Sequence, residues 1–241
     1  PGDTYANRMP DPVLQQVEHF NNPGITANDA FKPVTRYFDR ITRPEQIIQS
    51  FPAAVQTMLD PADCGPACIA LSQDVQGQTF DYPEEFFKER VHAIRRPRPD
   101  EFQIKEAAEK IKSSKNPIII SGGGVFYSDA MEELSQFAIK HNIPVTQTVM
   151  GYSTMKRDHS HFAGQIGGLG GKNTNTLAKE TDLAIAVGTK LADFTTGSWA
   201  NFENKNFKLV SINVSRFDAN KHLAQAVIGC LLYTSDAADD P

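Results

Sequence analysis

From residue 101 to residue 229, short apolar segments alternate with segments of helical periodicity. The pattern predicts helices at about 101–115, 128–141 and 173–180, and strands at 117–121, 143–149, 183–187, 208–214 and from 226 onward. Strands that alternate with helices form a parallel sheet, because each crossover helix packs on a face of the sheet. This part of the chain is therefore predicted to be an α/β domain with a Rossmann-like parallel sheet.

Three glycines, Gly122, Gly123 and Gly124, follow the first predicted strand. A dinucleotide-binding turn has the pattern G-x-G-x-x-G, whose glycines allow a tight turn and a close approach of the pyrophosphate. Tyr127 stands in place of the third glycine, and the ribose-binding acid expected about 20 residues later is missing. We therefore expect a structural turn that does not bind NAD, although a helix that starts here could still attract an anion.

Two further segments are candidate ligand contacts in the predicted sheet. The glycine-rich loop 164–171 could either contact a ligand or serve as a flexible crossover. Gly188 and Asp193 follow a strand, and they therefore lie at the carboxyl edge, where ligands of such sheets bind. Asp193 could pair with a ligand hydroxyl or cap a turn, and we favour the cap. His159 and His161 lack partners at metal-ligand spacing, so no metal site is expected there.

Composition excludes some classes of protein. The net charge of −5 argues against a broad nucleic-acid-binding surface. No apolar run approaches the roughly 20 residues that span a bilayer, so no membrane contact is expected. Cys64 and Cys68 do not have CxxC spacing, and they are expected to be buried and reduced, while the third cysteine, Cys230, falls in the adapter-like residues described below.

Residues 1–100 have a different organisation. A helix is expected from Asp11 and another over about 42–59, followed by a buried strand at 65–72, while residues 1–30 read as loop and 31–40 as mixed. The proline-rich stretch up to residue 100 reads as a linker whose basic cluster, Arg95–Arg98, is solvated.

Residues 230–241 can be back-translated into a transposase-type sequencing adapter, so we expect them to be non-biological. The chain is then expected to be a fragment truncated at both ends.

Four stretches resemble the thiamine-diphosphate enzymes of the acetolactate-synthase group. They are Asp29–Arg36, Gly65–Val75, Asn116–Val125, and Asp182–Asp193 with Ile212–Ser215. The resemblance implies the end of a pyrimidine-binding domain at 1–76, a linker at 77–100 and a central domain at 101–229, followed by the adapter-like residues 230–241. The runs Arg8–Gln16, Thr26–Pro33, Arg40–Gln46 and Ser72–Val75 are particularly similar to the members of the group that hydrolyse a ring carbon–carbon bond in a cyclic polyhydroxy diketone of inositol catabolism.

The resemblance implies that thiamine diphosphate supplies the chemistry and that Mg²⁺ anchors its diphosphate. The activating Glu is expected before residue 1 and the GDG…N motif for Mg²⁺ after residue 229, so we expect no catalytic residue and no metal ligand in this chain. FAD binds the central domain of some relatives, but the incomplete glycine pattern makes it an unexpected ligand here. A synthase or decarboxylase of the same group, or a nucleotide-binding module without catalysis, stays an alternative.

The same resemblance points to a substrate-side loop at Phe31 and Lys32. Acetolactate synthases usually have Gln and Glu after this Phe, whereas Lys32 and Pro33 follow it here. Lys32 could hold a hydroxyl or carboxylate of the substrate, or it could be an exposed loop lysine. Arg8 and Asp11 are further substrate-side candidates. The implied partners are a small-molecule substrate, another domain of the same chain and a second subunit of a cytoplasmic homo-oligomer.

Overall fold

The computed structural model describes residues 1–8, 19 and 21–233. They form two compact units, Pro1–Arg95 and Arg96–Pro241, and each unit has a parallel sheet of its own. The expected helix from Asp11 and the adapter-like residues after 233 lie outside the described residues. None of the helices in the described part is long and apolar enough to cross a membrane.

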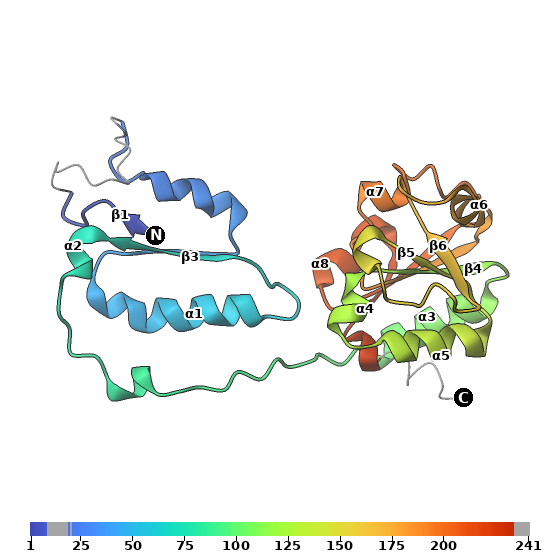
Figure 1. The fold of residues 1–241 in the computed structure, drawn as a ribbon, viewed down its shortest axis with the longest axis horizontal. Helices are drawn as coiled ribbons and strands as arrows, with labels where there is room; N and C mark the ends of the chain where they lie inside the picture. Colours follow the sequence, from blue (N-terminus) through green and yellow to red (C-terminus); the bar gives the residue numbers. More distant parts are fainter. Residues whose placement is uncertain (9–18, 20, 234–241) are drawn as a thin grey trace. The chain divides into compact units, whose positions relative to one another are not determined.

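The first unit is built on a three-stranded parallel sheet (Figure 1). Its strands β1 (Gly2–Asp3), β3 (Ala67–Ser72) and β2 (Tyr37–Ile41) lie in the order β1-β3-β2. Helix α1 (Ile47–Leu59) packs against β2 and β3, and the 3-10 helix η1 (Ala27–Val34) lies on the other side of the sheet (Figure 1). Helix α1 and strand β3 confirm the predicted elements. Strands β1 and β2 were not predicted, since β1 has only two residues and the side chains of β2 are mostly half-buried.

The segment after β3 carries little regular structure. Helix α2 (Gln73–Gln76) and the 3-10 helix η3 (Glu84–Phe87) are short, and the rest of the stretch to residue 100 has none. The Tyr82 hydroxyl donates a hydrogen bond to the Pro44 carbonyl at 3.2 Å, which ties part of this stretch to the first unit. The basic cluster is exposed, as expected, but Arg96 Nη1 donates to the Ser128 carbonyl and the Arg98 guanidinium lies over the Tyr233 ring.

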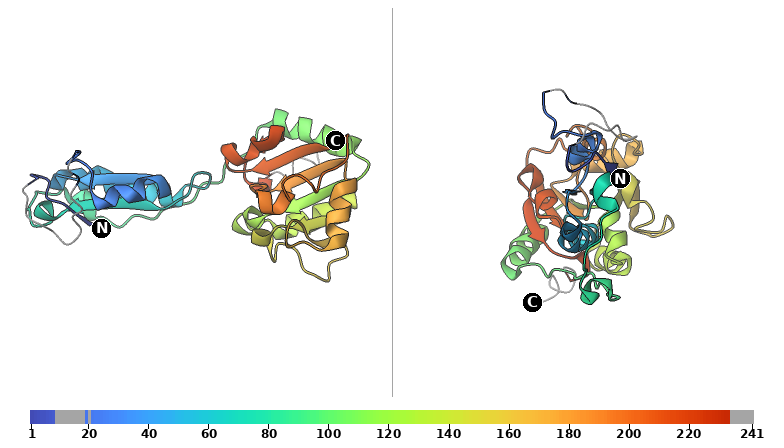
Figure 2. Two further views of the ribbon diagram at one scale, coloured as in Figure 1. Left: turned by 90° about the horizontal axis from the view of Figure 1, so that it is seen from above. Right: turned by 90° about the vertical axis from the view of Figure 1, so that its left-hand side faces the viewer.

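The second unit is a doubly wound six-stranded parallel sheet (Figure 2). Its strands have the order β6-β5-β4-β7-β8-β9. They are β4 (Pro117–Ser121), β5 (Val145–Gln147), β6 (Phe162–Gln165), β7 (Leu183–Val187), β8 (Lys208–Asn213) and β9 (Gln225–Ile228). Counted along the chain, this is the order 3-2-1-4-5-6 of a dinucleotide-binding fold. The predicted Rossmann-like parallel sheet is confirmed.

Alternate residues of the strands enter two separate cores. Ile119, Ile185 and Val210 face the core formed with helices α3 (Glu101–Ser113) and α5 (Met131–His141). Their neighbours in the strands, such as Ile120 and Ala186, face a second core that includes Ala178 of helix α6 (Lys172–Glu180). Because both faces are covered, the strands are nearly continuous apolar runs, which is why their positions could be predicted.

Two details of this unit differ from the predictions. Helix α5 confirms the helix expected at about 128–141, but a separate short helix, α4 (Gly123–Tyr127), precedes it, and Asp129 in the turn between them has a φ of 58°. The edge strand β6, which overlaps the start of the glycine-rich loop 164–171, was not predicted. Strand β6 pairs with β5 through a register shift at Val145/Thr146, and Gly164 beside it has a φ of 99°, so its sequence lacks the regular alternation of a strand.

Candidate functional site

The carboxyl end of the six-stranded sheet is the first candidate site. The strand order reverses between β4 and β7, and open α/β sheets bind ligands in the crevice at such a point. The turn that contains Gly122, Gly123 and Gly124 follows β4, and the turn that contains Gly188 follows β7. The glycine turns that follow β4 and β7 are therefore neighbours at the point of the sheet where such folds bind ligands.

The two turns are in direct contact at this crevice. The Gly122 N–H donates to the Val187 carbonyl, and the Gly124 N–H donates to the Gly188 carbonyl, both at 2.9 Å. A Cβ atom on Gly124 would lie 2.6 Å from Gly188 Cα, and one on Gly188, whose φ is 59°, would lie 2.7 Å from Gly124 Cα. The glycines thus allow backbone to pack on backbone, and two N–H groups that could bind a phosphate already have partners.

Asp193 lies in the short helix α7 (Asp193–Thr196) after β7. Its Oδ1 accepts a hydrogen bond from Ser198 Oγ at 2.7 Å, and its carbonyl accepts from the Gly197 N–H at 2.8 Å. The loop after β6 packs against the same helix, because the Gly168 N–H donates to the Phe194 carbonyl at 2.8 Å. The Asp193 carboxylate thus pairs with the Ser198 side chain, and Ala192 is the N-cap of α7. The roles of Asp193 and of the glycine-rich loop stay predictions.

A layer of buried polar side chains lies below the turns. Ser121 Oγ is 2.7 Å from Thr154 Oγ1, which also accepts a hydrogen bond from Gln147 Nε2 at 3.2 Å. Thr146 Oγ1 donates to the Ile119 carbonyl at 2.9 Å. Thr146 and Gln147 lie at the end of β5, where a dinucleotide-binding fold would have its ribose-binding acid. Their side chains hydrogen-bond to other side chains and to the backbone. They fix the strand ends and do not point a free polar group at a ligand.

The second candidate site is the 3-10 helix η1 of the first unit, which carries Phe31 and Lys32. The helix begins with a capping box: Thr26 Oγ1 accepts from the Asn28 N–H at 3.3 Å, and Asp29 Oδ2 accepts from the Thr26 N–H at 2.6 Å. The side chain of Phe31 is exposed, with 46% of the residue's surface accessible. The local sequence T-A-N-D thus holds the loop that presents these two predicted residues.

Ion pairs connect this helix to the sheet. Lys32 Nζ lies 2.6 Å from Asp29 Oδ1, Arg40 Nη2 lies 2.6 Å from Asp29 Oδ2, and Arg40 Nε lies 2.6 Å from Asp3 Oδ2. Lys32 Nζ also lies 5.1 Å from the centroid of the Phe38 ring. Asp3, Arg40, Asp29 and Lys32 are called the η1 ion-pair chain below. Of these four residues, the family resemblance had named only Lys32 as a site candidate. The ion pairs of Arg40 could not be predicted, because they join residues that are distant in sequence.

The pKa values in the η1 ion-pair chain follow from these contacts. Burial raises the pKa of Asp29, but the hydrogen bonds from Lys32, the Thr26 N–H and Arg40 outweigh it, so the pKa is well below its usual range. Burial also raises the pKa of Asp3, but the hydrogen bonds from Arg40, Thr26 and the Thr4 N–H outweigh it, so the pKa of Asp3 is lowered. Because both carboxylates titrate lower in the folded chain, they stabilise it above pH about 4, and this stabilisation is lost as the pH falls through the folded pKa.

The remaining sequence candidates are more dispersed. Arg8 is exposed, with a φ of 59°, and Asp11 lies outside the described residues. Cys68 is buried as expected, but Cys64 is exposed, so that expectation was wrong for it; Cys230, for which burial was not predicted, is also buried. Within the described part of the chain, no three His, Cys, Asp or Glu side chains gather closely enough to hold a metal ion.

Comparison with known proteins identifies the family. Residues 104–234 match the family described as "Thiamine pyrophosphate enzyme, central domain". The chain belongs to the thiamine pyrophosphate enzymes. The resemblance found in the sequence is thereby confirmed, and the glycine turns described above are the crevice of the central domain of such an enzyme.

Curated relatives of this thiamine pyrophosphate enzyme include proteins named 3D-(3,5/4)-trihydroxycyclohexane-1,2-dione hydrolase. That of Clostridium perfringens (strain 13 / Type A) is 50% identical over 229 residues, which are 95% of this chain and 36% of the relative. That of Bacillus licheniformis is 50% identical over 224 residues, or 92% of this chain and 35% of the relative. The chain therefore spans about a third of the length of the curated relatives it matches.

Solved structures agree on the fold. A benzoylformate decarboxylase from Polynucleobacter necessarius matches with a TM-score of 0.70 at 21% identity, over 98% of this chain and 45% of that one. An enzyme from Mycobacterium smegmatis described as a putative thiamin diphosphate-dependent enzyme matches with a TM-score of 0.67 at 19% identity, over 87% of this chain and 41% of that one. At these identities the likeness concerns the fold alone.

Proposed function

We propose that this chain is part of a thiamine-diphosphate-dependent hydrolase that cleaves a carbon–carbon bond in a cyclic polyhydroxy diketone. The observation that carries the proposal is the identity of about half of all residues, over nearly the whole chain, to proteins named for the hydrolysis of trihydroxycyclohexane-1,2-dione. We place the reaction in inositol catabolism in the cytoplasm.

The described residues supply positioning and not the reacting group. Thiamine diphosphate, when bound, supplies the nucleophile for cleavage next to a carbonyl. We propose that the residues that hold the cofactor and the metal belong to other parts of the enzyme. In our proposal, the first unit completes a pyrimidine-binding domain and η1 presents Phe31 and Lys32 to the substrate. The central domain acts as a scaffold and leaves its crevice without FAD.

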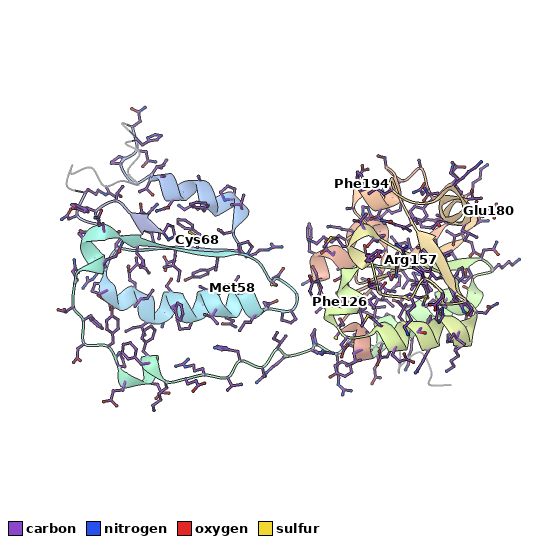
Figure 3. The ribbon with its side chains drawn as sticks, viewed as in Figure 1. Met58, Cys68, Phe126, Arg157, Glu180 and Phe194 are labelled. Carbon is purple, nitrogen blue, oxygen red and sulfur yellow. The ribbon has the colours of Figure 1, made fainter. Side chains whose placement is uncertain are left out.

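We further propose that the carboxyl edge of the central domain contacts another domain or a second subunit. Each of the strands β4, β5, β6, β7 and β8 is followed by at least one large exposed apolar side chain. These are Phe126, Tyr127, Val149, Met150, Tyr152, Leu169, Phe194 and Phe217. Phe126 and Phe194 are labelled in Figure 3. Because the carboxyl ends of parallel strands share one edge, these side chains gather there, and exposed apolar patches of this kind mark interaction sites.

The test is an assay of the complete gene product with thiamine diphosphate and Mg²⁺. Ring opening of trihydroxycyclohexane-1,2-dione, with no conversion of pyruvate, is the expected result. Conversion of pyruvate in place of the dione would support the acetolactate-synthase or decarboxylase alternative. The complete reading frame is also expected to contain a GDG motif followed by an Asn about 25–30 residues later, as the diphosphate site of this group requires. A frame without that motif would contradict the proposal.

A further inference from the structure

The η1 ion-pair chain is electrically balanced. It contains two carboxylates, Asp3 and Asp29, and two cations, Arg40 and Lys32, in alternating contact. Each carboxylate lies within hydrogen-bond distance of at least one cation, so their charges cancel locally. An approaching ligand therefore meets a neutral group of four side chains and not an isolated positive charge.

The members of this chain differ in how freely they can move. The side chain of Asp3 is fully buried, those of Asp29 and Arg40 are 15% and 21% exposed, and that of Lys32 is 53% exposed. If Lys32 turns toward a ligand, the carboxylate of Asp29 still has partners, because Asp29 Oδ2 keeps its bonds to Arg40 Nη2 and to the Thr26 N–H, both at 2.6 Å. Lys32 is therefore the one member of the four that is placed to contact a ligand.

The pairing with Asp29 determines what Lys32 can recognise. An ammonium has three N–H donors, so one can remain on Asp29 while the others bind hydroxyl or carbonyl oxygens. A ligand carboxylate on the same ammonium would lie close to the carboxylate of Asp29, and like charges at such a distance repel. Asp29 thus favours neutral oxygen-rich ligands over anionic ones.

We propose that Asp29 is a specificity-determining residue: it holds Lys32 as a hydrogen-bond donor for a neutral polyhydroxy ketone and disfavours anionic 2-oxo acids such as pyruvate. This inference rests on the proposed function for the position of Lys32 at the substrate. It goes further by assigning the choice between neutral and anionic substrates to a residue that does not itself contact the substrate.

The first test needs no catalysis. The 241-residue chain is titrated with pyruvate and with myo-inositol while the side-chain NMR signals of its lysines are followed. In Asp29→Asn, pyruvate is expected to bind at Lys32 at least about fivefold more tightly than in the unchanged chain, and 1 M salt is expected to remove the gain. Asn can still accept the Thr26 N–H, so the capping box is kept. Myo-inositol binding should change less than twofold.

The matched control is Glu45→Gln. It raises the net charge by the same amount, but Glu45 pairs with Arg43 at 2.7 Å and takes no part in the η1 ion-pair chain. If pyruvate binding in Asp29→Asn exceeds that in Glu45→Gln by less than about twofold, the inference is overturned. Loss of the gain in Asp29→Asn/Lys32→Met is expected, and persistence of the gain in that double variant would also overturn it.

The second test uses the complete enzyme and leaves the capping box untouched. Lys32→Gln keeps an N–H donor without the charge, and Lys32→Met removes both. We expect the KM for the cyclic dione to rise about tenfold in Lys32→Met and less than about threefold in Lys32→Gln, with kcat nearly constant in both. Equal losses in the two variants would show that charge and not hydrogen bonding matters, and the inference would be wrong. An enzyme that does not open the dione would contradict the proposed function, while the NMR titration would still decide the role of Asp29.

Discussion

Replacement of Gly124 by Ala tests whether the crevice of the central domain is filled by its own backbone. The new Cβ would lie 2.6 Å from Gly188 Cα and 2.9 Å from the Gly188 carbonyl oxygen, so no flexible side chain can move aside. Overpacking of this kind costs about 3 kcal/mol. Loosening of the bond from the Gly124 N–H to Gly188 adds about 1 kcal/mol. The higher helix propensity of Ala returns about 1 kcal/mol. The expected net loss is about 3 kcal/mol.

Urea unfolding followed by tryptophan fluorescence reports on the second unit, which contains Gly124. Trp199 is the only tryptophan of the chain, and it packs against Phe202, Phe207 and His222 within the second unit. With a slope of about 2 kcal/mol per molar urea, the midpoint should fall by about 1.5 M.

The control for this prediction is Gly168→Ala. Its Cβ would meet the Phe194 ring at 3.6 Å, an ordinary contact, so its stability should change by less than about 0.5 kcal/mol. A Gly124→Ala midpoint as close to that of the unchanged chain as the control's would refute the view that the two turns are in tight contact.

Three further predictions concern both units. Arg40→Met should cost the first unit about 3–5 kcal/mol, because it leaves the buried carboxylate of Asp3 without a cation; far-UV circular dichroism should record the loss while the Trp199 fluorescence transition stays in place. Acidification from pH 6 to pH 3 should lower the urea midpoint of the first unit, since the pKa values of Asp3 and Asp29 are lowered by folding. A midpoint that rises on acidification would contradict this sign. FAD or NAD at 1 mM should leave the melting temperature of the chain unchanged to within about 1 °C, whereas binding at a Kd near 10 μM would raise it by several degrees.

The strands that lie at the centre of the second sheet could be predicted to the residue. Pro117–Ser121 and Leu183–Val187 have the bounds expected for β4 and β7, because helices cover both faces of these strands and every position favours an apolar or small residue. The edge strand β6 escaped prediction for the opposite reason. It is only half-buried, and a register shift with a left-handed Gly164 interrupts its pattern.

The candidate site was predictable only in part. The missing third glycine and the missing acid led to the expectation of a structural turn, and the backbones of Gly124 and Gly188 are in contact there. That the turn binds no nucleotide stays a prediction. Those contacts could not be derived, because they join turns that follow different strands. The η1 ion-pair chain also could not be predicted from the sequence. Arg40 and Asp3 are 37 positions apart, and Asp3 belongs to a strand of only two residues.

Helix α3, the first helix of the second unit, packs against β9, the last strand among the described residues. Lys110 Nζ donates to Gln225 Oε1 at 2.8 Å, Gln225 Nε2 donates to Glu106 Oε2 at 2.8 Å, and the Ile228 N–H donates to Gln103 Oε1 at 3.0 Å. During synthesis on the ribosome, α3 must therefore wait for almost the entire domain to be translated before its partner strand emerges. The same arrangement brings entry and exit of the domain to one corner, so a circular permutant that joins them with a short linker should keep its native sheet.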